Sequence, residues 1–399
     1  MRPYTPNLKP RTPNRTYQMR SVLQMFKGDR VIWVLLVLLT VYSGVAVASS
    51  VASLAYRDGG DVTIHIIRHI AFLAVGWGII YIVHLIPYRF YSISATILLL
   101  ASVGLLIFTL AKGMVLNDAA RWIKIPGTGV TFQTSDFAKI ALVIFVARFL
   151  SRNQTEIQDF KRGFLPVLLV IGVVCGLILP ENFSTAFILF TTCLVLLYIG
   201  RVKVKYLLGL VGSGVLLVVV FLLIGRITGA STRAETWQNR IEHYFSKDDT
   251  SEAHFQSTKA KIAIANGGMF GKFAGHSTQR RSLPQAYSDF IFAIVIEEYG
   301  FIFGALPLIF IYLILLYRAG VIVRRCDRTF PAFMTIGLMI GLVMQAMVNM
   351  GVSSGLLPVT GQPLPWVSRG GTSILFTALA LGIILGISRS LEEEAKVET

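Results

Sequence analysis

Charged residues are scarce in this 399-residue sequence. Asp, Glu, Lys and Arg together make up 15% of it, against about 25% in ordinary soluble proteins. Apolar residues make up 54% and the mean hydropathy is +0.66, values that a single anchor or a cleaved signal peptide could not produce over this length. These proportions exclude a water-soluble domain and predict a polytopic membrane protein.

Cysteines are also few, and they are not grouped. Cys175 and Cys193 lie in apolar runs and Cys326 lies in a basic stretch, so neither a disulfide framework nor a metal cluster is predicted. The net charge of +16 would suggest nucleic-acid binding in a soluble protein. Here the basic residues fall mainly in short gaps between apolar runs, which is the pattern that orients helices in a membrane. No nucleic-acid partner is expected.

The apolar residues form continuous runs instead of alternating with polar ones, which favours helices over a membrane barrel. A span needs roughly 20 apolar residues, and shorter runs can be completed by flanking residues. We therefore predict an all-α polytopic membrane protein with ten transmembrane helices, at 31–51, 70–86, 91–111, 137–150, 164–179, 185–199, 206–225, 290–317, 332–350 and 373–387.

Lys and Arg residues predict the orientation. Segments on the side of the termini carry 21 of them and the short opposite loops carry six, so both termini are expected in the cytoplasm. The remaining opposite segment, 226–289, is long enough, at about 60 residues, for this rule to lose force. The predicted organisation is a disordered, Pro- and Arg-rich cytoplasmic arm at 1–30 that can touch membrane lipids, helices 1–7 at 31–225, a large extracellular loop at 226–289, helices 8–10 at 290–387 and a cytoplasmic tail at 388–399.

Ionisable residues inside or beside spans are expensive and are therefore functional candidates. Lys139 lies two residues into a predicted span and follows Asp136, although a lysine there could equally extend to the membrane interface. Glu297 and Glu298 lie seven and eight residues after Phe290. We expect this pair either to line a polar cavity or to lie beneath the extracellular loop.

Asp289 stands directly before an apolar run and has two interpretations. Ser288 or Asp289 could cap the helix that follows. Alternatively, a carboxylate at the outer membrane boundary, against apolar walls, loses hydration and becomes a better proton acceptor. Such a group could serve a lipid-linked substrate whose headgroup lies at that height.

Two glycine-rich stretches lie near these residues. The stretch 266–272 resembles a phosphate-binding P-loop, but Asn266 replaces its first glycine and Phe273 its Ser or Thr, so its glycines more plausibly allow a turn and a close backbone approach. The stretch 351–373 holds three prolines, which forbid a continuous helix. Irregular backbone at membrane depth is tolerated inside protein or beside a wet cavity. We predict a re-entrant segment that lines the outer cavity.

Four blocks of this sequence resemble the SEDS family (shape, elongation, division and sporulation proteins), which includes FtsW and RodA. Leu283–Gly300 and Gly355–Ser373 are the specific blocks, and 121–139 and 180–186 support them. The resemblance covers nearly the whole chain from Val31 onward. It implies a peptidoglycan glycosyltransferase of the bacterial cytoplasmic (inner) membrane that polymerises lipid II at the outer face. The short tails and the Gly-Leu-Leu-Pro sequence favour the FtsW side, which acts in division, over elongation.

Residue roles are carried over from the family where the motifs match. Asp289 resembles the family's catalytic carboxylate, the general base for the acceptor sugar's 4-hydroxyl. Glu297 and Glu298 match its Glu-Glu-x-Gly sequence, and Lys139 matches a cavity lysine suited to the donor pyrophosphate. The expected substrate-binding residues are Lys139, Arg121, Glu297, Glu298, Arg369 and Ser368.

Several positions depart from the family pattern. Gln285 and Tyr287 replace its Glu and His before the aspartate, and Arg369 replaces its Tyr before Gly-Gly. Asp136 stands for a Glu, and Asn182 for an Asp. Arg369 would add a cation facing the substrate.

The resemblance also suggests partners and leaves alternatives open. A class B penicillin-binding transpeptidase is the expected protein partner, and lipid II the expected substrate. A divalent cation, Mg²⁺ or Mn²⁺, could stabilise the leaving pyrophosphate, but no metal site is evident in the sequence. A lipid II flippase and a non-catalytic scaffold of the division machinery remain as alternative functions.

Overall fold

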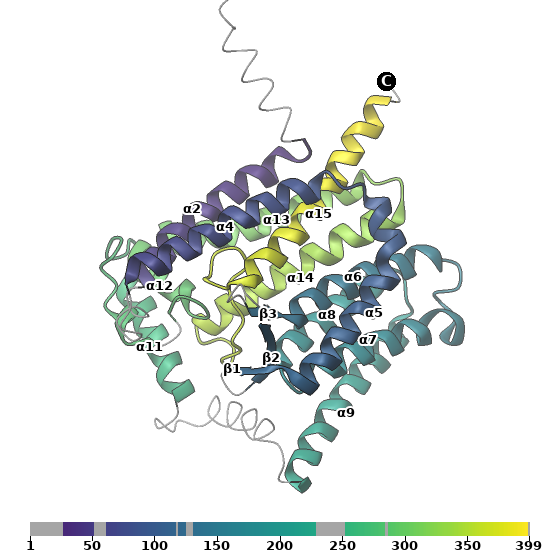
Figure 1. The fold of residues 1–399 in the computed structure, drawn as a ribbon, viewed down its shortest axis with the longest axis horizontal. Helices are drawn as coiled ribbons and strands as arrows, with labels where there is room; N and C mark the ends of the chain where they lie inside the picture. The colour runs from purple at the N-terminus through teal and green to yellow at the C-terminus, as the bar shows by residue number, and fades with distance from the viewer. Residues whose placement is uncertain are drawn as a thin grey trace, which may run out of the picture.

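The computed structural model describes residues 27–51, 61–116, 119–124, 131–228, 252–283 and 286–397. The main helices are α2 (Arg30–Ser50), α4 (Val62–His84), α5 (Tyr88–Lys112), α6 (Thr134–Arg152), α7 (Leu165–Ile178), α8 (Phe183–Ile199), α9 (Val204–Thr228), α11 (Glu252–Gly267), α12 (Ile291–Gly300), α13 (Leu306–Arg324), α14 (Thr329–Ser353) and α15 (Thr372–Val397). Figure 1 shows α2, α4 and α15 running side by side across the bundle.

Every predicted apolar run overlaps a helix of the structure. Among the described residues, seven helical stretches are long and apolar enough to cross a membrane, and α8 and Val204–Val220 of α9 are shorter apolar helices. The helix α6 is not among them, because it carries polar residues in its first turns and at its last turn. Most of its residues are buried, so neighbouring protein replaces lipid around it. The chain is a multi-pass, predominantly helical membrane protein.

A small sheet lies between α5 and α6 and was not predicted. The strands β1 (Met114–Leu116), β2 (Ala119–Lys124) and β3 (Thr131–Gln133) pair antiparallel in that order. Strands of three to six residues are too short for an alternating pattern to stand out in the sequence. The sheet is a small addition to an all-α multi-pass membrane protein, the fold class that the sequence predicts.

The predicted span 290–317 is interrupted. Gly300 has a φ of 73° and ψ of −175°, a conformation open essentially to glycine alone. It ends α12, and the π-helical turn η3 (Phe301–Ala305) then leads into α13. At 1.5 Å per residue, the 19 residues of α13 cover about 28 Å, close to a bilayer core. Nearly all of α12 is buried.

The predicted arm and tail are both partly ordered. Residues 27–30 pack against the bundle, where Asp29 caps α2 at Val31 and pairs with Arg318, and Lys27 lies 3.0 Å from Glu393. The helix α15 continues to Val397, well beyond the predicted span end at 387. Residues 1–26 of the predicted arm lie outside the described residues.

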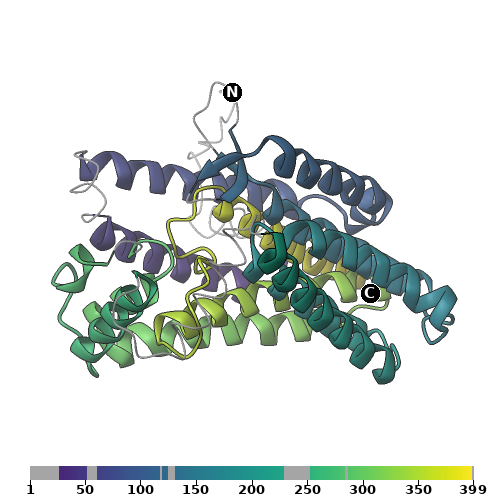
Figure 2. The same cartoon turned by 90° about the horizontal axis from the view of Figure 1, so that it is seen from below.

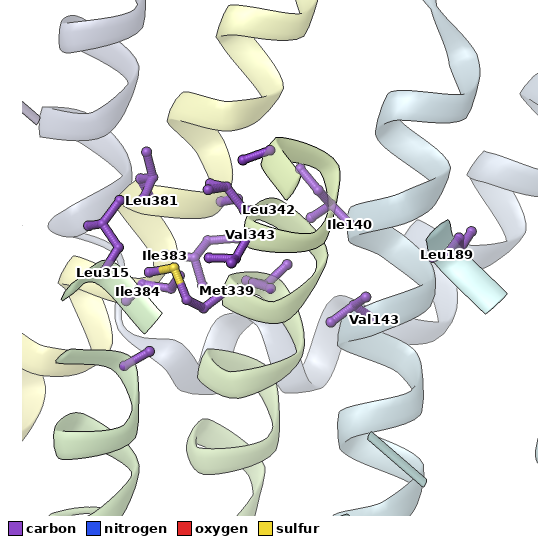
Figure 3. Close-up of a cluster of buried hydrophobic side chains, with 14 of the residues drawn as sticks. Ile140, Val143, Leu189, Leu315, Met339, Leu342, Val343, Leu381, Ile383 and Ile384 are labelled. Atoms are coloured by element: carbon purple, nitrogen blue, oxygen red, sulfur yellow. The ribbon is translucent and has the colours of Figure 1, made fainter. Parts of the chain in front are cut away.

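The core is centred on α14. Figure 3 shows Met339, Leu342 and Val343 of this helix between side chains of α6, α8, α13 and α15. Figures 1 and 2 both show α11 and α12 gathered at one end of the bundle, away from the C-terminal end of α15. The predicted loop 226–289 thus contains the helix α11 and the short 3₁₀ helix η2 (Gln279–Arg281), while residues 229–251 and 284–285 lie outside the described part.

Candidate functional site

The two most specific sequence blocks meet in the structure. The hydroxyl of Ser368 donates to the carbonyl of Ser288 (2.7 Å) and accepts from the backbone N–H of Leu364 (2.8 Å). The backbone N–H of Arg369 donates to the carbonyl of Tyr287 (3.0 Å). Hydrogen bonds therefore join residues about 80 positions apart, and the segment 364–369 fixes the turn before α12.

Asp289 lies in that turn and is half-buried. Its Oδ1 accepts a hydrogen bond from the hydroxyl of Ser288 (2.9 Å). A Cβ added to Gly361 would lie 3.6 Å from the Oδ2 of Asp289, so the carboxylate lies close to backbone that carries no side chain. The N-cap of α12 is Phe290. The interpretation of Ser288 or Asp289 as the helix cap is therefore wrong.

A row of polar side chains on α14 holds Asp289 in place. Gln345, Asn349 and Ser353 are spaced four residues apart and so share one face of the helix. The Nδ2 of Asn349 donates to the carbonyls of Asp289 (2.9 Å) and Gln362 (2.7 Å). The hydroxyl of Ser353 donates to the same Asp289 carbonyl (3.3 Å). We call Gln345, Asn349 and Ser353 the polar row of α14.

The same row reaches Lys139. The Nζ of Lys139 donates to Oε1 of Gln345 (2.9 Å) and lies 2.8 Å from Oδ1 of Asp136. The Nε2 of Gln345 donates in turn to the carbonyl of Pro363 (3.0 Å). Lys139 thus pairs with Asp136 and Gln345 inside the bundle. These contacts favour a lysine within the protein over one that extends to the membrane interface. One helix face positions both the predicted base and the predicted pyrophosphate partner.

Lys139 and Asp136 lie at the polar part of a cavity. The space has a volume of ≈ 70 Å³, is partly open to the surroundings, and lies between α6, α8, α14 and α15. Most of its wall is apolar, with Ile140, Leu189 and Phe376 among the lining side chains. A cation beside an apolar cavity suits a ligand that joins an anionic group to a hydrocarbon.

Two of the departures from the family pattern contact each other. The guanidinium of Arg369 lies over the ring of Tyr287, 5.5 Å from its centroid, and its Nη2 is 2.9 Å from Nδ1 of His65 at the start of α4. Stacking on Tyr287 is a cation–π arrangement. The two replacements are therefore complementary, and Arg369 stands beside the turn that carries Asp289.

Glu297 and Glu298 lie beneath the predicted extracellular loop and bind it, which is one of the two arrangements that the sequence predicts. Both are fully buried. Glu297 accepts from the backbone N–H and the hydroxyl of Thr278 (3.1 and 2.7 Å) and from the hydroxyl of Ser277, while Glu298 accepts from the hydroxyl of Ser49. Neither glutamate lines the cavity at Lys139. These hydrogen bonds hold the loop against α12, and a substrate-binding role for the two glutamates stays a prediction.

Asn182 and Gln362 link a further block to the site. Asn182 caps α8 by accepting from the N–H of Thr185 (3.2 Å). The Nε2 of Gln362 donates to Oγ1 of Thr185 (2.9 Å) and to Oδ1 of Asn182 (3.4 Å). Asn182 therefore still contributes an oxygen acceptor, the property that an Asp would share.

Some site predictions rest on residues that the structure does not describe in full. Arg121 lies in β2, and its side chain, like Gln285, is outside the described part. Within the described residues, no group of three or more His, Cys, Asp or Glu side chains could hold a metal ion. We therefore assign no chemical step to a divalent cation.

The polar row of α14 was not predicted from the sequence. Its signal was present, because two amides and a hydroxyl at i, i+4 and i+8 are unusual in an apolar helix and mark a face that packs on polar backbone. Gln345 and Asn349 fall within the predicted span 332–350, where hydropathy averaged over neighbours conceals them.

The chain is similar to known proteins over most of its length. A family model for FtsW, RodA and SpoVE, described as "Cell cycle protein", matches residues 29–393. The probable peptidoglycan glycosyltransferase FtsW of Coxiella burnetii is 32% identical over 356 residues, covering 87% of this chain and 92% of that protein. Stage V sporulation protein E of Bacillus subtilis is 32% identical over 331 residues, covering 81% and 86%.

Two solved structures share the fold. A chain from a peptidoglycan synthase complex that coordinates polymerization and crosslinking matches with a TM-score of 0.72 and 24% identity, over 91% of this chain and 98% of that one. Thermus thermophilus RodA matches with a TM-score of 0.65 and 23% identity, over 91% and 97%.

Proposed function

This chain belongs to the FtsW, RodA and SpoVE family of cell cycle proteins, the SEDS family, and from that membership we propose how it acts. It is a multi-pass membrane protein and a probable peptidoglycan glycosyltransferase. We propose ten spans, with both termini in the cytoplasm and α11 and α12 at the outer face, and polymerisation of lipid II at that face with Asp289 as general base.

The observation that carries the proposal is that the polar row of α14 fixes both chemical groups. Asn349 and Ser353 hold the backbone of Asp289, and Gln345 holds the ammonium of Lys139. A transfer between two bound sugars needs its base and its cation at a set separation, because misplacement by about 1 Å can cost about 100-fold in rate. A single rigid helix supplies that separation.

The proposed reaction is a displacement at an anomeric carbon. The carboxylate of Asp289 takes the proton from the acceptor's 4-hydroxyl as its oxygen bonds to the anomeric carbon of the donor. The bond from that carbon to the lipid pyrophosphate breaks, and the pyrophosphate leaves with the electron pair. Lys139 stabilises its charge, and the anomeric centre inverts. One base is enough, unlike the two carboxylates of a glycosidase.

The cavity wall supports a lipid-linked donor. Apolar side chains of α6, α8, α14 and α15 surround a space with Lys139 at its polar part. This arrangement suits a prenyl pyrophosphate, whose hydrocarbon can lie against the wall while its phosphates meet the cation. Arg369, held over Tyr287, would supply a second cation near Asp289.

Replacing the proposed base tests this function. Asp289→Asn keeps the size of the side chain but removes the base, and we expect glycan-chain synthesis from lipid II to fall by about 10²–10⁴-fold. Asp61→Asn is the matched control, because Asp61 is the exposed cap of α4 and Asn also caps helices. Near-normal polymerisation by Asp289→Asn would refute the role.

The same assay separates the enzyme from the alternatives. A polymerase makes long glycans from lipid II in detergent, whereas a flippase needs a sealed membrane. A scaffold would make no glycan under either condition. Synthesis in detergent that Asp289→Asn abolishes is the outcome that the proposal requires.

We further propose a division role with a class B penicillin-binding transpeptidase as partner. Several curated relatives are FtsW proteins, and a fold relative belongs to a complex for polymerization and crosslinking. Depletion should give filaments with unfinished septa. Rounded cells would assign the protein to elongation instead.

A further inference from the structure

The turn between α11 and α12 exposes large apolar side chains. Met269, Phe270 and Phe273 are 57%, 69% and 79% exposed, the reverse of what a loop in water favours. Further along the same loop the exposed residues are small or polar, including Ala274 and His276. Among the described residues between α11 and α12, the exposed large apolar side chains therefore all lie at residues 269–273, which we call the aromatic turn.

Backbone hydrogen bonds and a glycine fix the conformation of the aromatic turn. Three backbone hydrogen bonds of 2.8–3.1 Å join it to the end of α12 and the start of η3, at residues 297, 298 and 302, and the neighbouring Gly268 accepts a fourth from the N–H of Phe301 (2.9 Å). Gly271 has a φ of 80°, and a Cβ there would lie 2.3 Å from the carbonyl oxygen of Glu298. The glycines thus allow two backbones to touch, as the sequence suggested. The turn cannot fold its rings inward, because backbone fills that space.

Phe273 shows the same constraint. It has a φ of 70°, a left-handed conformation that non-glycine residues rarely adopt. Such strain persists where the surroundings impose it. Here it directs the most exposed ring of the turn away from the protein.

The aromatic turn lies at the depth of a membrane span. The ring of Phe270 is 6.5 Å from that of Phe303, and the carbonyl of Phe303 accepts from the hydroxyl of Tyr42 (2.8 Å). Tyr42 lies eight residues before Ser50, the end of α2, which corresponds to about 12 Å along the helix. The turn is therefore beside the outer part of a span rather than beyond its end.

The exposed surface is continuous with lipid-facing helix surface. Phe301 and Phe303 of η3 are exposed, and so are Phe310, Leu313 and Ile314 on α13. In a multi-pass protein such side chains meet acyl chains. The aromatic turn extends this apolar surface, because the rings of Phe270 and Phe303 lie next to each other where the two surfaces meet.

We propose that the aromatic turn is inserted in the outer leaflet and contacts lipid acyl chains. Phe270 and Phe273 are its anchors, and the backbone hydrogen bonds transmit their depth to α12 and to the loop 274–282. This anchor would keep the loop, and the glutamates that bind it, at a fixed height above the bundle. The competing occupant is a transmembrane helix of a partner protein.

Depth measurements with spin labels test the proposal directly. Single cysteines replace Phe270 or Phe273 in full-length protein whose Cys175, Cys193 and Cys326 are changed to Ala, and each variant is labelled with a nitroxide in phospholipid nanodiscs without any partner. The labelled loop controls are Ala274→Cys and His276→Cys. Leu313→Cys on α13 is the lipid-facing control.

We expect labels at 270 and 273 to behave like the label at 313, with collisions with oxygen exceeding those with a water-soluble nickel chelate. Labels at 274 and 276 should show the opposite order. The proposal is overturned if 270 and 273 match 274 and 276. It is equally overturned if they become protected from nickel only after a partner transpeptidase is added, because protein then covers the turn. All the labelled sites are exposed, and a melting curve for each variant confirms that it is folded.

Discussion

The ion pair of Lys139 and Asp136 allows stability and catalysis to be separated. Their side chains are 20% and 6% exposed, and the charged atoms are 2.8 Å apart. Removing one partner of a buried pair typically costs about 3–5 kcal/mol, because the other charge stays buried and uncompensated. Lys139 is partly exposed, so we expect Lys139→Met to cost about 3 kcal/mol, the lower end of that range.

Neutralising Asp136 as well should restore stability. In the double variant Lys139→Met with Asp136→Asn no charge remains unpaired, and replacing a buried pair by neutral residues is often nearly neutral in stability. We expect the melting temperature in detergent to fall in the single variant and largely recover in the double one. Lys161→Met, an exposed lysine before α7, should melt like the native protein.

Polymerisation should not recover with stability. If Lys139 stabilises the leaving pyrophosphate, both variants should lose about 10²–10³-fold in glycan synthesis from lipid II. Recovery of synthesis in the double variant would show that Lys139 acts only as a counter-charge for Asp136. A single variant as stable as the native protein would refute the idea that the carboxylate is desolvated.

Three other measurements examine separate parts of the structure. Asn349→Leu removes the two hydrogen bonds that the buried Asn349 side chain donates, so it should cost about 2 kcal/mol and lower polymerisation; undiminished synthesis would contradict positioning of Asp289 by the polar row. Gly300→Ala should destabilise the protein by more than the ~1–3 kcal/mol of its backbone conformation, since a Cβ would lie 2.4 Å from the carbonyl oxygen of Met269. The control Gly320→Ala has open space around it and should melt like the native protein. Equal melting temperatures for the two variants would refute this reasoning. Burial raises the pKa of the Cys326 thiol from 9.0 to about 12, so the rate of its alkylation should still increase above pH 9. The contribution of this thiol to stability should be lost between about pH 9 and 12, because the thiol ionises first in the unfolded chain. An alkylation rate that levels off near pH 9 would be the contrary result.

Contacts between distant segments could not be predicted from the sequence. The sequence identified Asp289, Lys139 and the segment 351–373 as separate candidates, but not that Asn349 binds the carbonyls of both Asp289 and Gln362. Hydrogen bonds across 60 residues depend on how helices pack, and no local pattern records that packing. In the same way, the sequence did not indicate that Ser277 and Thr278 donate hydrogen bonds to Glu297.

The positions of the apolar helices follow from composition along the chain, because each span must satisfy its own backbone and bury its own length in hydrocarbon. These requirements are local, so they can be read without knowing the neighbours of a residue. The break at Gly300, the sheet β1–β3 and the pairing of Tyr287 with Arg369 depend on which surfaces meet. Only the packed structure selects one such arrangement from the many that the same hydropathy permits.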